Sequence, residues 1–247
     1  MSHLPRIESA GLDGWLVRLF DEIEETNVAW LSALAKRCEA AFGKALVDLI
    51  PSYTTLLVIF DPFTLAPGQA REVLASLLAT LEPGTSLGSG KIKEVPVCYD
   101  VRFAADLPRV AERAGMELQA VIDCHSDKLY RVFALGFAPG FAFMGSVDSR
   151  IETPRLETPR QRIPAGSVAL AGRQTAAYPL VSPGGWNILG RTPATLFDRH
   201  RQGFSLLQVG DRVRFIPLSF GEYKKLGGDI RPMESSTTIT GEKGKAK

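Results

Sequence analysis

Apolar positions in two segments of the first half of the chain repeat with the period of a helix. Within residues 27–42 they recur every three to four positions, and residues 67–81 repeat the pattern. This spacing puts the apolar side chains on one face of an amphipathic helix. The positions are Val28, Leu31, Leu34, Ala35 and Cys38 in the first segment, and Val73, Leu74, Leu77, Leu78 and Leu81 in the second. Two helices that each bury one face are therefore expected.

Other segments of this half have the pattern of β-strands. The segments are residues 6–10, 15–20, 45–50, 53–60 and 91–99. Residues 53–60 form a nearly continuous apolar and β-branched run, which is typical of a central strand. Residues 91–99 alternate like a last strand that leaves the sheet. This order of strands and helices predicts a ferredoxin-like α+β domain at residues 1–95.

The second half predicts a different architecture, made of short strands and dense turns. Strands are expected at residues 129–135, 167–171, 175–181, 186–190 and 213–217. Many short strands with glycine- and proline-rich turns are typical of a closed β-barrel or a sandwich. We expect this domain at residues 96–220, with the boundary near Val95-Pro96. Residues 221–247 are expected to form a largely disordered tail, because the sequence from Met233 onward has no apolar periodicity.

Composition excludes several classes of function. The net charge of +2 is too balanced to predict nucleic-acid binding. No apolar run has the length of a membrane span, and the first residues lack the pattern of a signal peptide. Cys38, Cys98 and Cys124 have no CxxC spacing, so neither a disulfide framework nor a metal site is expected. A reducing cytoplasm is the expected location.

Three glycine- and proline-rich blocks between residues 135 and 193 are the strongest candidates for a site. Aromatic residues are interleaved with the glycines, so the segment is expected to be ordered rather than a flexible linker. Glycines there can let backbone N–H groups approach a ligand, or they can serve the tight turns of a packed barrel corner. The candidate ligand-binding residues are Gly136, Phe137, Pro139, Gly140, Phe141, Thr175, Gly184, Gly185 and Trp186.

Polar residues of the same region supply candidate catalytic groups. From Leu129 to Tyr223 the chain has eleven arginines and no lysine, although lysines occur elsewhere. Arginine binds carboxylates and phosphates with two parallel hydrogen bonds, but surface arginines with no such role are equally compatible with the pattern. His125 can act as an acid, a base or an anion partner, or it can be a hydrogen-bonded structural residue. The candidates are His125, Arg160, Ser167, Gln174 and Arg191.

Taken together, these motifs resemble the family that comprises the B-type subunit of bacterial 5-oxoprolinase and allophanate hydrolase subunit 1. Related members were named as inhibitors of a sporulation histidine kinase, and a fused version forms part of the carboxyltransferase domain of urea carboxylase. The resemblance extends from about Ile7 to Pro217. Its motifs are PSYTTLLVIFDP, VPVCYD, His125 with a following hydroxyl residue, LGFAPGFAFMG, PRQRIPAGSVALAGRQTAAYP and SPGGWNILGRTP. Ala176-Ala177 depart from the glycine and aliphatic residue that are usual there.

The resemblance implies a ferredoxin-like domain followed by a cyclophilin-like β-barrel. It also implies a non-autonomous subunit of an ATP-dependent enzyme that opens the lactam of 5-oxoproline to glutamate. The partners would be a homologous C-type subunit, which forms a composite site with this chain, and an A-type subunit. ATP with Mg²⁺ would act in the assembled complex, since the sequence has no Walker loop or dinucleotide fingerprint.

Two other functions remain open at this point. The first is a subunit of an allophanate hydrolase or urea carboxylase, and the second is a non-catalytic inhibitor of a histidine kinase. A peptidyl-prolyl isomerase is less favoured, because similarity of fold does not carry activity. In the catalytic case we expect one concave surface, since functional loops cluster. It would be lined by His125, the 137–141 loop, Arg160, Ser167, Gln174, Thr175 and Arg191.

Overall fold

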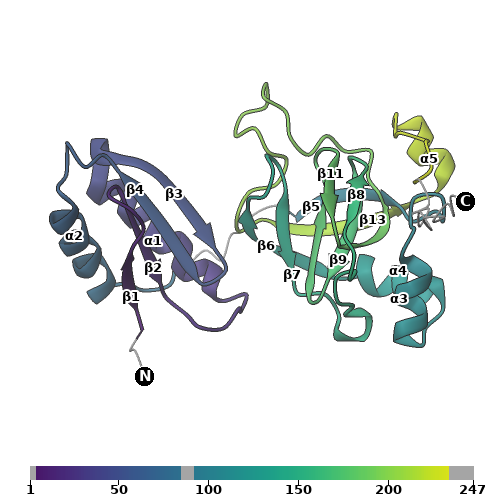
Figure 1. The fold of residues 1–247 in the computed structure, drawn as a ribbon, viewed down its shortest axis with the longest axis horizontal. Helices are drawn as coiled ribbons and strands as arrows, with labels where there is room; N and C mark the ends of the chain where they lie inside the picture. The colour runs from purple at the N-terminus through teal and green to yellow at the C-terminus, as the bar shows by residue number, and fades with distance from the viewer. Residues whose placement is uncertain (1–3, 85–91, 234–247) are drawn as a thin grey trace, which may run out of the picture.

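The computed structural model describes residues 4–84 and 92–233. These residues form two parts that lie side by side (Figure 1): a small sheet with two helices, and a β-barrel with its own helices. In this part of the chain no helix combines the length and the hydropathy that crossing a bilayer requires.

The N-terminal part is a four-stranded antiparallel sheet with the strand order β1-β2-β4-β3. The helices α1 and α2 bury their apolar sides against it, as the helical periodicity predicts. Val17, Leu34 and Val58 lie at the centre of this core and are fully buried. The elements are β1 (Arg6–Ser9), β2 (Gly14–Arg18), α1 (Asn27–Phe42), a 3₁₀ turn (Gly43–Ala45), β3 (Leu46–Ser52), β4 (Thr55–Phe60) and α2 (Pro67–Ala79).

The C-terminal part is a closed barrel of seven strands in the order β6-β13-β5-β12-β9-β10-β7, with β7 pairing back onto β6. Its interior holds aliphatic residues such as Val132, Leu170 and Val213, and the helices α3 and α4 pack onto the same core. The strands are β5 (Ile92–Cys98), β6 (Leu129–Leu135), β7 (Ala142–Gly145), β9 (Ser167–Ala171), β10 (Gln174–Ala177), β12 (Asn187–Arg191) and β13 (Arg212–Leu218). The chain is thus α+β with a barrel, as expected.

Smaller elements surround the barrel. Two short strands, β8 and β11, form a separate ribbon. The elements are α3 (Leu107–Ala114), α4 (Leu118–Ser126), a 3₁₀ turn (Ser149–Ile151), β8 (Arg160–Ile163), β11 (Ser182–Gly184) and α5 (Phe220–Lys225).

One strand lies in a different sheet from the one that its pattern suggested. Residues 91–99 were expected to end the N-terminal sheet, but β5 pairs in parallel with β13 along its whole length and also touches β12. The alternation of apolar and polar residues correctly predicted that this segment is a strand, but such a pattern does not indicate which strand it pairs with. The boundary expected at Val95-Pro96 falls inside this strand, and we propose that the division between the two parts lies before Ile92.

The two parts of the molecule meet at the tip of the β3–β4 hairpin. Ser52 of β3 pairs with Ala134 of β6, which links the small sheet to the barrel wall. The neighbouring Tyr53 stacks its ring on Phe133 of the barrel, with ring centroids 5.6 Å apart.

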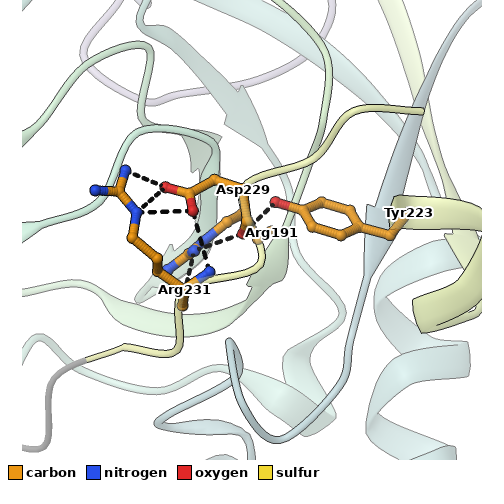
Figure 2. A network of polar contacts seen from close by, with 4 residues as sticks. All are labelled: Arg191, Tyr223, Asp229 and Arg231. Atoms are coloured by element: carbon orange, nitrogen blue, oxygen red, sulfur yellow. Dashed lines mark hydrogen bonds and ion pairs between the residues drawn. The ribbon is translucent and has the colours of Figure 1, made fainter. Parts of the chain in front are cut away.

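The chain after residue 220 is ordered up to Met233, contrary to the tail expected from residue 221. The helix α5 begins with a capping box between Ser219 and Glu222. Behind it, the buried guanidinium of Arg191 donates to the carbonyl oxygens of Asp229 at 3.1 Å and Arg231 at 2.7 Å (Figure 2). These contacts use backbone oxygens, so no side-chain pattern of the segment could have revealed them. Residues 234–247 lie outside the described part of the chain.

A buried ion pair connects the ribbon, a helix and the barrel. Arg160 of β8 donates to both carboxylate oxygens of Asp106, at 2.8 and 2.9 Å. The same carboxylate accepts from the backbone N–H of Ile188 in β12, at 2.7 Å. Asp106 stands at the start of α3 and is almost completely buried. One carboxylate therefore fixes three separate elements.

Removing this carboxylate is expected to destabilise the fold strongly. Asp106→Ala leaves a buried guanidinium and a buried N–H unpaired, which costs on the order of 3–5 kcal/mol. Arg160→Lys keeps the charge but loses the two-pronged contact, at a cost of about 1–2 kcal/mol. Urea unfolding at pH 7 measures both. Arg150→Ala, which breaks an exposed pair with Asp148, is the control and should leave the midpoint unchanged. Equal midpoints for Asp106→Ala and Arg150→Ala would contradict the assignment.

Candidate functional site

The barrel wall separates residues that are neighbours in the sequence. Successive residues of a strand point to opposite faces. In β9, Val168 and Leu170 belong to the interior core, whereas Ala169 lies in a second cluster on the outer side. Thr175 in β10 is fully buried beside His125, so its chain neighbour Gln174 faces outward. The structure therefore divides the predicted site residues between two environments.

His125 is the centre of a closed hydrogen-bond chain inside the barrel. Its Nε2 lies 2.9 Å from Oγ1 of Thr175, and that hydroxyl donates to the carbonyl oxygen of Ala169 at 3.0 Å. The Thr175 oxygen must then accept, which places the imidazole proton on Nε2. Nδ1 is left to accept from the Tyr99 hydroxyl, at 2.7 Å. The ring also stacks on Phe215, with centroids 4.7 Å apart.

Burial keeps this histidine neutral. Its side chain has no exposure, and desolvation lowers its pKa from 6.5 to about 3. A neutral imidazole with both nitrogens occupied is a structural group. Of the two roles that the sequence left open for His125, the structure thus favours the structural one.

The expectation of one concave surface for all predicted residues is wrong. His125, Ser167 and Thr175 have no exposed surface, because they lie inside the barrel wall. Arg160 is bound to Asp106, and Arg191 is buried against the Phe103 ring, 4.6 Å from its centroid. Burial lowers the pKa of Arg191. Long-range partners of this kind are not readable from a single sequence.

The three glycine-rich blocks do converge, but through their aromatic rings. Seven rings form one connected set, with neighbouring centroids 4.8–6.4 Å apart. We call this set the outer aromatic cluster. It consists of Tyr53, Phe133, Phe137, Phe141, Phe143, Tyr178 and Trp186. Most of it is buried, but Phe137 is 65% exposed. Tyr53 comes from the N-terminal part, so the cluster lies where the two parts meet.

Small residues make room for these rings on the barrel wall. Ala169 and Ala171 of β9 and Ala176 of β10 face the cluster. Their side chains leave space that Trp186 and Phe141 fill. The pair Ala176-Ala177 fits this arrangement, since Ala176 faces the cluster and Ala177 points into the barrel interior.

Packing explains two of the four candidate ligand-binding glycines, Gly140 and Gly184. A Cβ on Gly184 would collide with the Tyr178 hydroxyl and the Ile163 side chain, and one on Gly140 would meet Phe197 at 2.8 Å. Gly185 lies against Leu156 and Pro159. Gly136 alone among these four has open space beside it. With Phe137 and Pro139 it lines a shallow hollow of about 400 Å³.

Polar groups stand at the edge of the outer aromatic cluster. The Gln174 amide donates to the Tyr53 hydroxyl. Tyr53 has a left-handed backbone, with φ of 41°, at the hairpin tip. A non-glycine residue persists in that conformation only where its surroundings hold it. Burial raises the pKa of both Tyr53 and Tyr178 to about 12, and the charge of Arg155 opposes this rise in each case.

Arg155 itself is held by its chain neighbours. The backbone N–H of Leu156 donates to the carbonyl oxygen of Gly185 at 2.7 Å. On the other side, the buried Asn187 amide donates to the carbonyl oxygen of Pro154 at 2.9 Å. Residues 154–156 are thereby clamped along residues 185–187, and the Arg155 guanidinium carbon lies 5.7 Å from the centre of the Trp186 ring. Arg155 was not among the candidate catalytic residues, because its sequence signal is the same as that of the other arginines nearby.

The described residues do not fit ATP or Mg²⁺ on their own. Within residues 4–84 and 92–233 no three metal-ligating side chains come together. A nucleotide also needs backbone N–H groups that open toward its phosphates. The sequence shows no Walker loop that would present such groups. The nucleotide expected from the resemblance is therefore not assigned to this chain.

Comparison with known proteins identifies the family. Residues 5–207 match the family described as carboxyltransferase domain, subdomain C and D. The chain belongs to this family. The match includes the barrel strands up to β12 and all seven rings of the outer aromatic cluster.

Relatives of this carboxyltransferase-domain protein are named as B-type subunits of 5-oxoprolinase. The one from Bacillus subtilis is 36% identical over 232 residues, which is 88% of this chain and 95% of the relative. The one from Haemophilus influenzae is 42% identical over 196 residues, which is 78% of this chain and 88% of the relative. Such a name implies that these proteins have partner chains.

Solved structures share the fold. A protein designated TTHA0988 is 40% identical with a TM-score of 0.73, over 83% of this chain, and the chain spans only 40% of its length. A conserved protein from Pyrococcus horikoshii is 39% identical with a TM-score of 0.53, over 88% of this chain and all of its own. Urea carboxylase from Kluyveromyces lactis has a TM-score of 0.72 over 91% of this chain and 23% of its own length. At 18% identity, this last similarity shows the fold alone.

The buried histidine predicts how the stability of this family member depends on pH. The folded-state pKa of His125 lies below the unfolded value, so the unfolded chain binds one proton more between about pH 6.5 and 3. The free energy of unfolding should fall by about 1.4 kcal/mol per pH unit as the pH drops through this window. Urea unfolding between pH 6.5 and 4.5 measures the slope. His125→Gln should reduce it, whereas the exposed His200→Gln should not. An unchanged slope in His125→Gln would refute the assignment.

Replacing a crowded glycine and replacing an uncrowded one by alanine should have opposite effects on stability. Gly184→Ala forces a methyl group against Tyr178 and Ile163 and should cost about 1–3 kcal/mol of stability. Gly136→Ala has open space and should be neutral or stabilising by up to about 1 kcal/mol. Thermal unfolding of both variants measures the difference. A neutral Gly184→Ala would show that packing does not require this glycine.

Proposed function

We propose that this chain is the B-type subunit of an ATP-dependent 5-oxoprolinase. In this role it joins a homologous C-type subunit and an A-type subunit, and it is inactive alone. The complex hydrolyses the lactam of 5-oxoproline to glutamate. The observation that supports the proposal most is the length of the similarity to the Bacillus subtilis relative, which extends over 95% of that protein.

The architecture is consistent with a partner-dependent site. The outer aromatic cluster ends at the exposed ring of Phe137, and Phe197 and Phe204 form a further partly exposed pair. The backbone of Gly140 packs against Phe197. Exposed aromatic residues are enriched where proteins bind one another. We therefore place the contact with the C-type subunit on this side of the barrel.

The chemistry also calls for more groups than this chain supplies. A lactam is stabilised by resonance, so its carbon must be made more electrophilic before water attacks, and ATP can do this by phosphorylating the oxygen. We assign the nucleotide with its Mg²⁺ to the assembled complex, because the described residues bring no three metal-ligating side chains together. What this chain contributes is a rigid aromatic surface with polar groups at its edge.

We further propose the finer fold and location that the resemblance implies. Four antiparallel strands with two helices support a ferredoxin-like N-terminal domain, and the closed barrel supports a cyclophilin-like second domain. All three cysteines are free thiols, two of them buried, which fits the cytoplasm as a reducing compartment.

Glutamate release tests the function directly. The chain, mixed with the A-type and C-type subunits of the same organism, should release glutamate from 5-oxoproline only when ATP and Mg²⁺ are present. Omitting any subunit should abolish the release, which amino-acid analysis measures. Full activity of this chain alone would refute the proposal. Turnover of urea or allophanate in place of 5-oxoproline would instead assign the complex to the urea pathway.

A further inference from the structure

Arg155 differs in its surroundings from the arginines of the barrel that are already bound to the protein. Many of those donate to oxygen atoms of the protein itself, among them Arg131, Arg150, Arg160, Arg191 and Arg201. Among the residues that the structure describes, the Arg155 side chain makes no hydrogen bond or ion pair with the protein, and its one contact of note is with the Trp186 ring. Its five N–H groups are thus available to an external acceptor.

The position of this arginine is nevertheless built, not incidental. The Asn187 side chain has no exposure and donates to two carbonyl oxygens, those of Pro154 at 2.9 Å and Leu170 at 3.1 Å. On the other side of Arg155, Leu156 is bound to Gly185. A buried amide is costly unless all its groups are paired. Here the paired Asn187 amide fixes the backbone on one side of the exposed Arg155, and the Leu156–Gly185 hydrogen bond fixes it on the other side.

The ring below the guanidinium keeps the hydrogen-bonding edges open. A guanidinium that lies over an aromatic face is attracted by the ring, and its N–H groups remain free to bind other groups. Trp186 provides this face, at 5.7 Å. The charge of Arg155 also reaches the hydroxyl groups of Tyr53 and Tyr178. Tyr53 in turn is bound by the Gln174 amide, which adds neutral polar groups at the same edge.

We infer that Arg155 binds the carboxylate of a small ligand at the edge of the outer aromatic cluster, where its guanidinium lies over Trp186. One guanidinium matches one carboxylate in charge and shape, through two parallel N–H···O bonds. The aromatic rings suit a flat apolar ring attached to that carboxylate. The inference rests on the proposed function, under which the ligand is 5-oxoproline, a lactam ring with a single carboxylate.

Binding of 5-oxoproline to the isolated chain tests the inference without any catalysis. The chain has three tryptophans, and Trp186→Phe assigns the indole N–H signal of Trp186 in the NMR spectrum. L-5-Oxoproline should shift this signal in a saturable way. 2-Pyrrolidinone, the same lactam without the carboxylate, should bind at least about ten-fold more weakly, because a charge-assisted hydrogen-bonded pair is lost.

Two substitutions of Arg155 distinguish the contribution of its paired N–H groups from the contribution of its positive charge. Arg155→Gln should weaken 5-oxoproline binding about ten-fold or more, and Arg155→Lys should recover only part of the loss. Arg214→Gln removes the same charge from β13, a strand that contributes no ring to the outer aromatic cluster. It should leave binding unchanged. Equal weakening by Arg155→Gln and Arg214→Gln would reduce the effect to net charge and overturn the inference.

Measurements on the assembled complex distinguish the inference from the function on which it rests. In an active complex, Arg155→Gln should raise the KM for 5-oxoproline far more than it lowers kcat. An active complex whose KM is unaffected by Arg155→Gln overturns the inference and leaves the function intact. Arg155-dependent binding with no glutamate release refutes the function but not the carboxylate site. Loss of assembly with the C-type subunit, with 5-oxoproline binding unchanged, would show that Arg155 pairs with a carboxylate of the partner instead.

Discussion

Closure of the barrel is the constraint on which the rest of this structure depends. Because β7 pairs back onto β6, every strand has one side in a sealed core and one side outside. The core side takes aliphatic residues and the hydrogen-bonded His125, which leaves no route to solvent. Any chemistry of the barrel strands must therefore use the outer side or the loops. The outer aromatic cluster, with Gln174 at its edge, is the place where polar and aromatic groups meet outside.

The sequence predicted the elements better than their partners. The helical periodicity of residues 27–42 and 67–81 matches α1 and α2 closely. The β5 strand was recognised, but its partners lie more than eighty residues away in the sequence, and alternation carries no information about them. The sequence alone could have predicted that the side chains of Gln174 and Thr175 face opposite sides of the barrel wall, because adjacent residues of a strand do so.

The candidate site shows the same division between local and long-range information. The glycine-rich blocks come together through their aromatic rings and not as the concave polar surface that we expected from the sequence. The polar residues were harder to judge. An arginine that ends on a buried aspartate, such as Arg160, has the same local sequence signal as one that is free to bind a ligand, such as Arg155. Only the position of Asp106, fifty-four residues away, distinguishes them.

The groups at the edge of the outer aromatic cluster come from both parts of the molecule and are held in fixed positions. Tyr53 keeps a left-handed backbone at the hairpin tip, and its ring stacks on Phe133 of the barrel while its hydroxyl accepts from Gln174. Strain of this kind persists only when several contacts impose it together. The same hairpin carries the strand pairing between the small sheet and β6. The relation between the two parts and the positions of Tyr53 and Gln174 at the edge of the cluster are thus set by one set of contacts, so a change that loosens the hairpin tip would also loosen that edge.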